Sequence, residues 1–276
     1  GKILSSSNES FTDIVNIGIG GSHLGPAMVT QALKPFHDGP NVHFVSNIDS
    51  SHITDVLADL NPKRTLILIA SKTFTTIETM TNAKTALTWM KDAVGEQNVS
   101  EHFAAISTAL EKTKDFGIKD NRVFGYWDWV GGRYSIWSSI GLGVMIAIGT
   151  KNFAEFLDGA YEMDQHFKNA PLEENMPVLL GLIGIWHINI CEYPTRAILP
   201  YDQRLSSFPS YIQQLDMESN GKSISSSGEM LYEKTGAIVW GDAGTNSQHS
   251  FFQLLHQGLE QLTKDIYLFI KDIDQL

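Results

Sequence analysis

Residues 14–26, IVNIGIGGSHLGP, join a short apolar run to a glycine-rich turn and the start of a helix. The same order returns at residues 65–80, TLILIASKTFTTIETM, where hydroxyl-bearing residues replace the glycines. Short apolar runs that alternate with helices are typical of a parallel sheet with crossover helices. Strands are expected at 14–19, 42–46, 65–71, 102–108 and 122–127, and helices at 23–35, 51–59 and 76–93. The first half therefore predicts a complete, doubly wound α/β domain.

The second half predicts a smaller unit of the same class. Helices are expected at 136–148, 153–167 and 176–192, and strands at 195–201 and 237–241. The change of pattern places the boundary near Thr150, so the expected domains are residues 1–149 and 150–276. Because two strands make a short sheet, we expect this second domain to be incomplete. Its apolar faces then need cover from the tail YLFIKDI (267–273) or from a partner chain.

Composition and charge exclude several classes of protein. Of the 276 residues, 42% are hydrophobic and 18% are charged, as in a packed globular protein. A formal charge of −11 argues against a general nucleic-acid binder but allows a local site for a small anion. Cys191 is the only cysteine, so we expect no intrachain disulfide, no cysteine-based metal site and a reducing, cytoplasmic setting.

The longest apolar stretch, Met176–Cys191, is shorter than the ~20 residues of a membrane span. It also contains Pro177, His187 and Asn189. We expect a buried helix there and no association with a membrane.

The glycine-rich turn allows three interpretations. Its glycines let backbone amides approach an anion at the positive end of a helix. A dinucleotide fingerprint needs a third glycine where His23 stands, which weakens a nicotinamide site, although Asp49 is placed to serve as its ribose ligand. A tight turn without any ligand needs the same glycines.

The loop that follows the strand 65–71 is the stronger candidate for an anion site. Thr75 and Glu78 have the spacing of a capping box, so a helix with outward-facing amides is expected to begin here. A helix cap needs one hydroxyl, whereas this loop offers four. The groups available to a phosphate are Ser71, Thr73, Thr76 and the cationic Lys72. The loop does not match GxxxxGK[ST], which argues against a nucleotide hydrolase.

Two further segments contain candidate catalytic side chains. Arg133 follows two glycines in WDWVGGRYSIWSSIGLG (127–143), and either a ligand or a salt bridge between domains accounts for it. Glu218 and Asp216 fall in the last turn of a helix expected to end at 219–221, where the negative end of the dipole disfavours carboxylates. Such an acid is a candidate base, and a solvated surface pair is the alternative.

Histidines are the remaining candidates. Thr245 and Gln248 again have capping-box spacing, which predicts His249 in the first turn of a new helix, as a neutral imidazole able to exchange protons. A structural histidine is the alternative. His256 lies seven residues further on, but no third ligand accompanies the pair, so no metal site is expected.

Taken together, these segments closely resemble the glucose-6-phosphate isomerase (phosphoglucose isomerase) family. The matching blocks, in family order, are NIGIGGSHLGP, ASKTFTT-ETMTN, DWVGGRYSIWSSIG, LPYDQ, QQLDMESNGK and GTNSQHSFFQLLHQG. The resemblance implies an aldose-ketose isomerase with two SIS-type doubly wound domains. It also implies a homodimer, a hexose 6-phosphate substrate, and no metal or organic cofactor.

The resemblance also assigns roles to residues. It makes Glu218 the base that moves a proton between C2 and C1 through a cis-enediol. Arg133 would stabilise the enediolate, and His249 would assist ring opening from the partner subunit. The positions that match phosphate and substrate binding are Ser22, Ser71, Lys72, Thr73 and Thr76, with Gln214 as a substrate-side glutamine.

The ends of the chain depart from the family. The usual N-terminal region and the late block with an active-site lysine have no match, and neither Lys264 nor Lys271 takes that role. Ile77 stands where the family usually has glutamine. We therefore expect a family core with altered or truncated ends, whose own turnover is low. Two alternatives remain open, a phosphosugar-binding SIS module without catalysis and a nicotinamide oxidoreductase.

Overall fold

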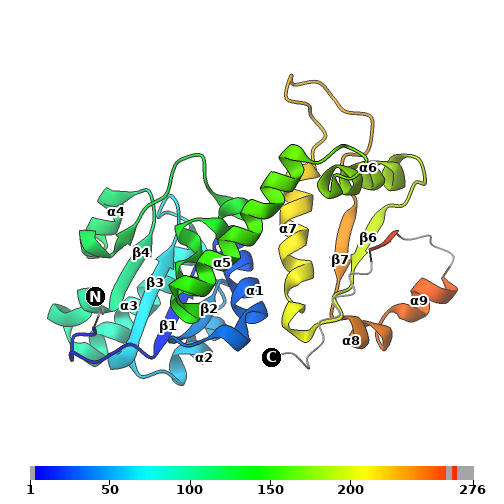
Figure 1. The fold of residues 1–276 in the computed structure, drawn as a ribbon. Coiled ribbons are helices and arrows are strands. Elements are labelled where there is room, and N and C mark those ends of the chain that lie inside the picture. The colour runs from blue at the N-terminus through cyan, green and yellow to red at the C-terminus, as the bar shows by residue number, and fades with distance from the viewer. Residues whose placement is uncertain (1–3, 259–262, 266–276) are drawn as a thin grey trace. The chain divides into compact units, whose positions relative to one another are not determined.

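The structure, a computed structural model, describes residues 4–258 and 263–265 (Figure 1). The chain divides into two compact units between Ala154 and Glu155, a few residues after the expected boundary at Thr150. The predicted covering tail, 267–273, lies outside the described residues.

A five-stranded parallel sheet forms the centre of the first unit, as the sequence predicts. Its spatial order is β2-β1-β3-β4-β5. The strands are β1 (Asp13–Ile17), β2 (Asn41–Val45), β3 (Thr65–Ala70), β4 (Phe103–Ile106) and β5 (Val123–Phe124). The chain leaves β1 towards one edge and β3 towards the other, so a topological switch point lies between these neighbouring strands. In open α/β sheets, ligands bind outside the carboxyl ends of the strands at such a point.

Helices cover both faces of this sheet. They are α1 (Leu24–Ala32), α2 (Ser50–Ala58), α3 (Ile77–Val94), α4 (Leu110–Asp115) and the first part of α5 (Leu142–Asn169). Ile67 and Ile69 of β3 pack in the cluster that includes α2 and α3, whereas Leu66 and Leu68 pack in the cluster on the other face. This alternation follows from the two-residue period of a strand and explains why β3 is buried along its whole length.

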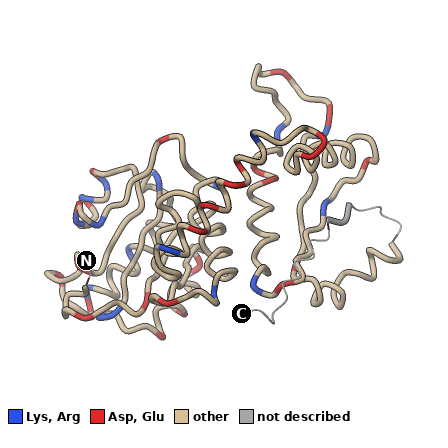
Figure 2. The backbone as a smooth tube through the Cα atoms, in the orientation of Figure 1, with Lys and Arg blue, Asp and Glu red and all other residues tan. Residues whose placement is uncertain are grey.

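The helix α5 changes character at Gly149, whose φ of 80° and ψ of 158° interrupt the helical backbone. Before this break, Val144, Ala147 and Ile148 are buried. After it, acidic residues become frequent (Figure 2). The span Ser139–Asn169 is long and apolar enough to cross a membrane, but a core helix of a globular protein meets the same criterion.

The second unit contains a smaller parallel sheet with the order β7-β6-β8. Its strands are β6 (Thr195–Ile198), β7 (Ile238–Gly241) and β8 (Thr263–Asp265). Its helices are α6 (Met176–Asn189), α7 (Phe208–Asn220), α8 (Gly244–Gln248) and α9 (Phe252–Gln257). The sequence predicted two strands here, and that number was too low because β8 is three residues long and polar.

The prediction of a buried helix at Met176–Cys191 is right about the helix and wrong about its burial. The helix α6 is present, but none of its residues is buried by the described part of the chain. Leu182, Ile185 and Trp186 are each close to 60% exposed. The apolar composition of the helix indicated that it packs against another surface. It could not indicate whether this stretch of chain provides that surface.

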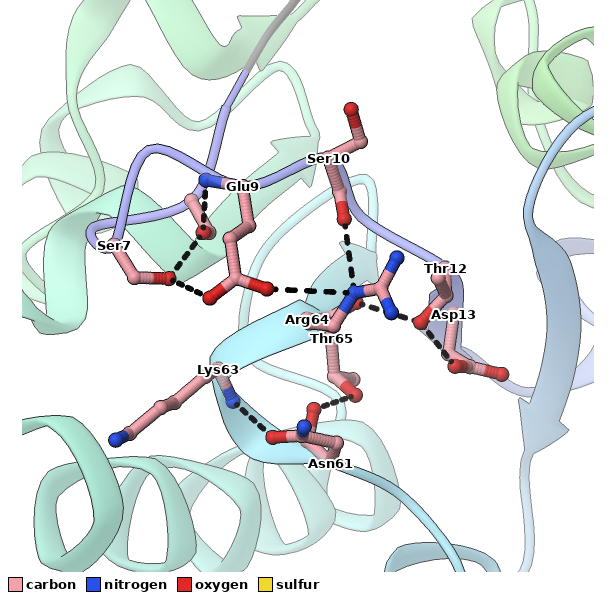
Figure 3. A network of polar contacts seen from close by, with 10 residues as sticks. Ser7, Glu9, Ser10, Thr12, Asp13, Asn61, Lys63, Arg64 and Thr65 are labelled. Atoms are coloured by element: carbon pink, nitrogen blue, oxygen red, sulfur yellow. Dashed lines mark hydrogen bonds and ion pairs between the residues drawn. The ribbon is translucent and has the colours of Figure 1, made fainter.

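A polar network fixes the amino end of the first sheet (Figure 3). The backbone amide of Thr12 donates to the Arg64 carbonyl at 2.9 Å, and Arg64 Nε donates to the Ser10 carbonyl at 3.5 Å and approaches Glu9 at 3.8 Å. These contacts lie directly before Asp13 in the chain, and Asp13 pairs with Thr65, the first residue of β3. They therefore set the register that brings the ends of β1 and β3 together.

Candidate functional site

Three loops meet at the carboxyl edge of the first sheet. They follow β1 (18–22), β3 (71–76) and β5 (125–133). An ideal Cβ placed on Gly18 would lie 3.0 Å from the Ala70 carbonyl oxygen, and one on Gly21 would lie 1.9 Å from the Gly132 carbonyl oxygen. Glycine is needed at both positions because backbone packs directly against backbone. The glycine turn, which includes Ser22, therefore joins the other two loops at the switch point.

The loop 71–76 is rigidly held. The Lys72 carbonyl accepts hydrogen bonds from Ser107 Oγ at 3.0 Å, from Thr108 Oγ1 at 3.0 Å and from the Thr108 amide at 3.2 Å. Buried Ser71 accepts from the Phe74 amide at 3.2 Å, and its own hydroxyl hydrogen stays available to a ligand. Fixed donors of this kind suit an anion because they need little reorganisation on binding.

Phe74 shapes the loop 71–76, and no prediction from the sequence included it. Its φ of 53° is unusual for a bulky residue, and its side chain is buried edge-on against Phe116. Such strain persists where the surroundings over-determine it. The turn that Phe74 makes sends the chain from β3 into α3, and its aromatic ring anchors that turn in the core. An aromatic residue among hydroxyls was the available signal.

The capping box predicted from Thr75 and Glu78 is wrong by one residue. Thr76 is the N-cap of α3, and its side chain makes no capping bond in the described structure. Thr75 instead shares a 2.8 Å hydrogen bond with Thr73. The Thr76 hydroxyl and the first amides of the helix are thus not used for capping, which favours a ligand at this helix start.

Two lysine side chains make hydrogen bonds at this loop or from it, in a chain whose overall charge is −11. Lys112, which no sequence pattern indicated, donates to the Thr73 carbonyl at 3.1 Å. Lys72 Nζ donates to carbonyls of the loop after β5, and the Arg133 guanidinium lies 4.9 Å from the centre of the Tyr134 ring. Elsewhere in each unit, basic and acidic positions are interspersed (Figure 2).

The nicotinamide interpretation loses its ribose ligand. The Asp49 carboxylate caps α2 and accepts from the Ser51 amide and hydroxyl, both at 3.0 Å. These hydrogen bonds lower the pKa of Asp49. His23, in place of the third glycine, lies edge-on to Phe44, and burial lowers its pKa. A helix cap and a packed imidazole therefore occupy the two positions that a dinucleotide would need.

In the second unit, α7 ends at Asn220 as predicted and carries both acidic candidates. The Asp216 carboxylate forms an ion pair with Arg196 at 3.6 Å and accepts a hydrogen bond from Asn220 at 2.8 Å, so its charge is paired within the second unit. Glu218 is exposed, with its backbone carbonyl accepting from Lys222. Gln214 Oε1 is buried with no hydrogen-bond partner in the described structure. Glu218 remains the candidate base of the two acids.

The prediction that His249 lies in the first turn of a helix is wrong. The helix α8 begins at Gly244, and His249 is its C-cap, exposed, with its amide donating to the Asn246 carbonyl at 3.0 Å. The Thr245 spacing misled because the chain enters the helix earlier, directly after β7. His249 therefore lies at the end of α8 and not at a helix N-terminus.

Glu218 and His249 lie at opposite ends of the second unit. The helix α7 crosses back between the parallel strands β6 and β7, so its last turn lies at the amino end of β7, whereas α8 follows the carboxyl end (Figure 1). The thirteen residues of α7 span ~20 Å.

Within the described residues, no group of three or more His, Cys, Asp or Glu side chains is placed to bind a metal ion.

The fold, with its loops at the switch point of the first sheet, defines the chain as a doubly wound α/β protein. A putative phosphosugar isomerase from Bacillus subtilis, 10% identical, has this fold with a TM-score of 0.54 over 94% of this chain and 77% of that one. The model of the family described as phosphoglucose isomerase matches residues 1–275, so the chain belongs to that family.

Individual relatives agree. The glucose-6-phosphate isomerase of Brucella ovis is 61% identical over 271 residues, covering 98% of this chain and 49% of that protein. The one of a Ruegeria species is 62% identical, covering 97% and 50%. A crystal structure of a glucose-6-phosphate isomerase from Chlamydia trachomatis has a TM-score of 0.86 at 38% identity, covering 93% and 50%. The chain thus spans about half the length of the curated relatives it matches.

Proposed function

We propose that the protein interconverts glucose 6-phosphate and fructose 6-phosphate by moving a proton between C2 and C1 through a cis-enediol. The observation that carries the proposal is the meeting of three loops at the switch point of the first sheet, where hydroxyls, helix amides and cations converge. The names of the relatives supply the substrate class.

The phosphate is held by the loop 71–76. The donors are the hydroxyls of Ser71, Thr73 and Thr76 and the first amides of α3, with Ser22 adjoining from the glycine turn. A doubly charged phosphate suits this helix start because the helix dipole and the oriented N–H groups favour negative charge. Since the phosphate does not react, its binding energy serves to hold C1 and C2 in place.

The proton transfer needs a base and a cation. An α-hydroxy carbon is a weak acid, so Glu218 takes its proton while Arg133 stabilises the charge that develops on the enediolate oxygen. An arginine suits the second role because it remains cationic in any surroundings. Gln214 binds on the substrate side. His249 assists the opening of the sugar ring, and the reaction uses no metal or organic cofactor.

We further propose that the working form is a cytoplasmic homodimer in which His249 reaches the site of its partner. The separation of Glu218 and His249 within one unit supports this arrangement. Mixing two inactive variants tests it, Glu218→Gln and His249→Asn. Random exchange of subunits restores one intact site in each mixed dimer, so about a quarter of full activity should return. If both residues act in the same subunit, mixing restores nothing.

Calorimetry with 6-phosphogluconate tests the phosphate site without requiring turnover. The double substitution Thr73→Ala and Thr76→Ala should weaken binding at least tenfold, since a hydrogen bond to a charged group contributes about 1.5 to 3 kcal/mol. Thr85→Ala with Thr88→Ala is the matched control, because these exposed hydroxyls donate only to α3 carbonyls. Equal affinity in both double variants would assign the loop hydroxyls to the fold alone.

A phosphosugar-binding module without catalysis is the second candidate, and the same calorimetry would not exclude it. A coupled assay with glucose-6-phosphate dehydrogenase separates the two functions. Turnover that disappears in Glu218→Gln supports the isomerase, whereas tight binding without turnover in a full-length, dimeric protein supports the module. Binding of NAD in place of the sugar phosphate would contradict both.

A further inference from the structure

Lys72 occupies an unusual position at the junction of two loops. Its backbone is fixed, because three donors from residues 107–108 converge on its carbonyl oxygen. Its side chain leaves the loop 71–76 and crosses to the loop after β5. There Nζ donates to the Asp128 carbonyl at 2.5 Å and to the Val130 carbonyl at 3.1 Å.

The loop that receives these hydrogen bonds is itself a turn. The Val130 amide donates to the Trp127 carbonyl at 2.9 Å, which curls the chain so that two carbonyls face the same ammonium. An ideal Cβ on Gly131 would lie 3.6 Å from Lys72 Nζ, so the lysine packs directly along this backbone. Three residues further along the loop from Val130 stands Arg133.

The segment that carries Arg133 is thus held from two sides. Gly21 lies against Gly132, whose φ of 57° only glycine adopts readily. Lys72 donates to the carbonyls of Asp128 and Val130, earlier in the same loop. We propose that Lys72 is a positioning residue, which fixes the Arg133 loop against the phosphate loop and does not itself bind the phosphate. This inference rests on the proposed function only for the role of Arg133.

The chemistry of the contacts favours this assignment. An ammonium has three N–H donors, and two of them are already directed to carbonyl oxygens. Breaking them to reach a phosphate would leave two carbonyls of a tight turn without a donor. The hydroxyls of the loop and the amides of α3 supply a phosphate with donors at no such cost.

Hydrogen exchange tests the connection without reference to activity. Lys72→Met keeps an unbranched side chain of nearly the same length but removes all donors, so amide exchange across 127–133 should accelerate by about tenfold. Exchange in β3 should not change. Lys72→Arg, which can donate to two carbonyls, should restore protection, and Lys84→Met on the exposed face of α3 is the matched control. Unchanged exchange across 127–133 in Lys72→Met would overturn the proposal.

Two ligands then separate positioning from phosphate binding. Glucitol 6-phosphate carries the phosphate on an uncharged chain, whereas a five-carbon aldonate phosphate adds a carboxylate that imitates the enediolate. In Lys72→Met, the affinity for the aldonate should fall about tenfold while that for glucitol 6-phosphate stays within twofold, and Lys72→Arg should recover most of the difference.

Parallel loss of affinity for both ligands would mean that Lys72 binds the phosphate, which overturns the proposal. If the unaltered protein binds neither ligand, the proposed function fails, and the exchange experiment still decides whether Lys72 holds the loop.

Discussion

The backbone contact between the glycine turn and the Arg133 loop gives a sharp prediction for Gly21→Ala. The added Cβ would lie 1.9 Å from the Gly132 carbonyl oxygen, 2.1 Å from its carbon and 2.7 Å from the Arg133 nitrogen. All three are backbone atoms, so no side chain can rotate away. The backbone at Gly21 does not have a positive φ, and the cost therefore comes from space alone.

The size of the effect follows from this overlap. An ordinary contact is about 3.4 Å, so the two segments must separate by roughly 1.5 Å, and overpacking of this kind costs about 1 to 3 kcal/mol. For a unit of this size, each kcal/mol lowers the melting temperature by about 2 to 4 °C. We expect the first unit of Gly21→Ala to melt a few degrees to about 12 °C lower than the unaltered protein.

Calorimetric melting with resolved transitions for the two units is the appropriate assay. Gly159→Ala is the control, because an added Cβ there meets nothing within 4 Å and alanine favours a helix by about 1 kcal/mol. The two substitutions should therefore change stability in opposite directions. If Gly21→Ala melts within 1 °C of the unaltered protein, the two backbones are not in contact, and the glycine turn does not join the Arg133 loop.

Three further predictions concern catalysis and pH. Glu218→Gln should lower isomerisation by ~100-fold to 10,000-fold in a coupled assay, while affinity for 6-phosphogluconate changes little. Activity per chain should rise with protein concentration, because Glu218 and His249 of one chain lie at opposite ends of their unit; a flat profile across dilution contradicts this. The His102 ring accepts a hydrogen bond from Ser6 and makes another with the Thr65 carbonyl, and burial lowers its pKa. The free energy of unfolding should therefore fall as the pH drops below about 6.5, the pKa of histidine in the unfolded chain. In urea titrations of His102→Gln, the free energy of unfolding should fall less between pH 7.5 and 5.5 than in the unaltered protein.

The sign of that pH dependence follows from proton linkage. The unfolded chain binds a proton on His102 more readily than the folded one, because the buried ring is the neutral form. Stability from this group is fully present above the unfolded pKa and declines as the pH falls towards the lower, folded pKa. An unchanged slope in His102→Gln would assign the acid sensitivity to other groups.

The first sheet could be predicted because its signals are local and repeated. Each strand lies in a short run with apolar residues, and helices separate successive runs, so all five strands of that sheet overlap the ranges that the sequence predicts. The strand β8 gave no such signal, since TKD is polar and too short for a periodic pattern. The exposure of α6 was equally unpredictable, because hydrophobicity states a need for cover but not its source.

The candidate site was predicted in its parts but not in its contacts. Hydroxyls at a helix start predicted the loop 71–76 as an anion site, but two capping-box patterns of the same spacing both misplaced the helix start, at Thr75 and at Thr245. A capping box is a four-residue pattern, whereas the helix start depends on where the preceding strand ends. The left-handed turn at Phe74 lay beyond sequence reasoning, because burial against Phe116 maintains it.

The two units carry different parts of the proposed reaction, and their physical character differs accordingly. In the first unit, the phosphate loop is anchored by three hydrogen bonds to one carbonyl and by a buried aromatic ring, so its donors are fixed before any ligand arrives. In the second, Glu218 and His249 are exposed at the ends of helices. A general base needs desolvation and a placed substrate to act well. Phosphate binding should therefore be retained in the first unit by itself. Proton transfer should require that the exposed helix ends with Glu218 and His249 be covered.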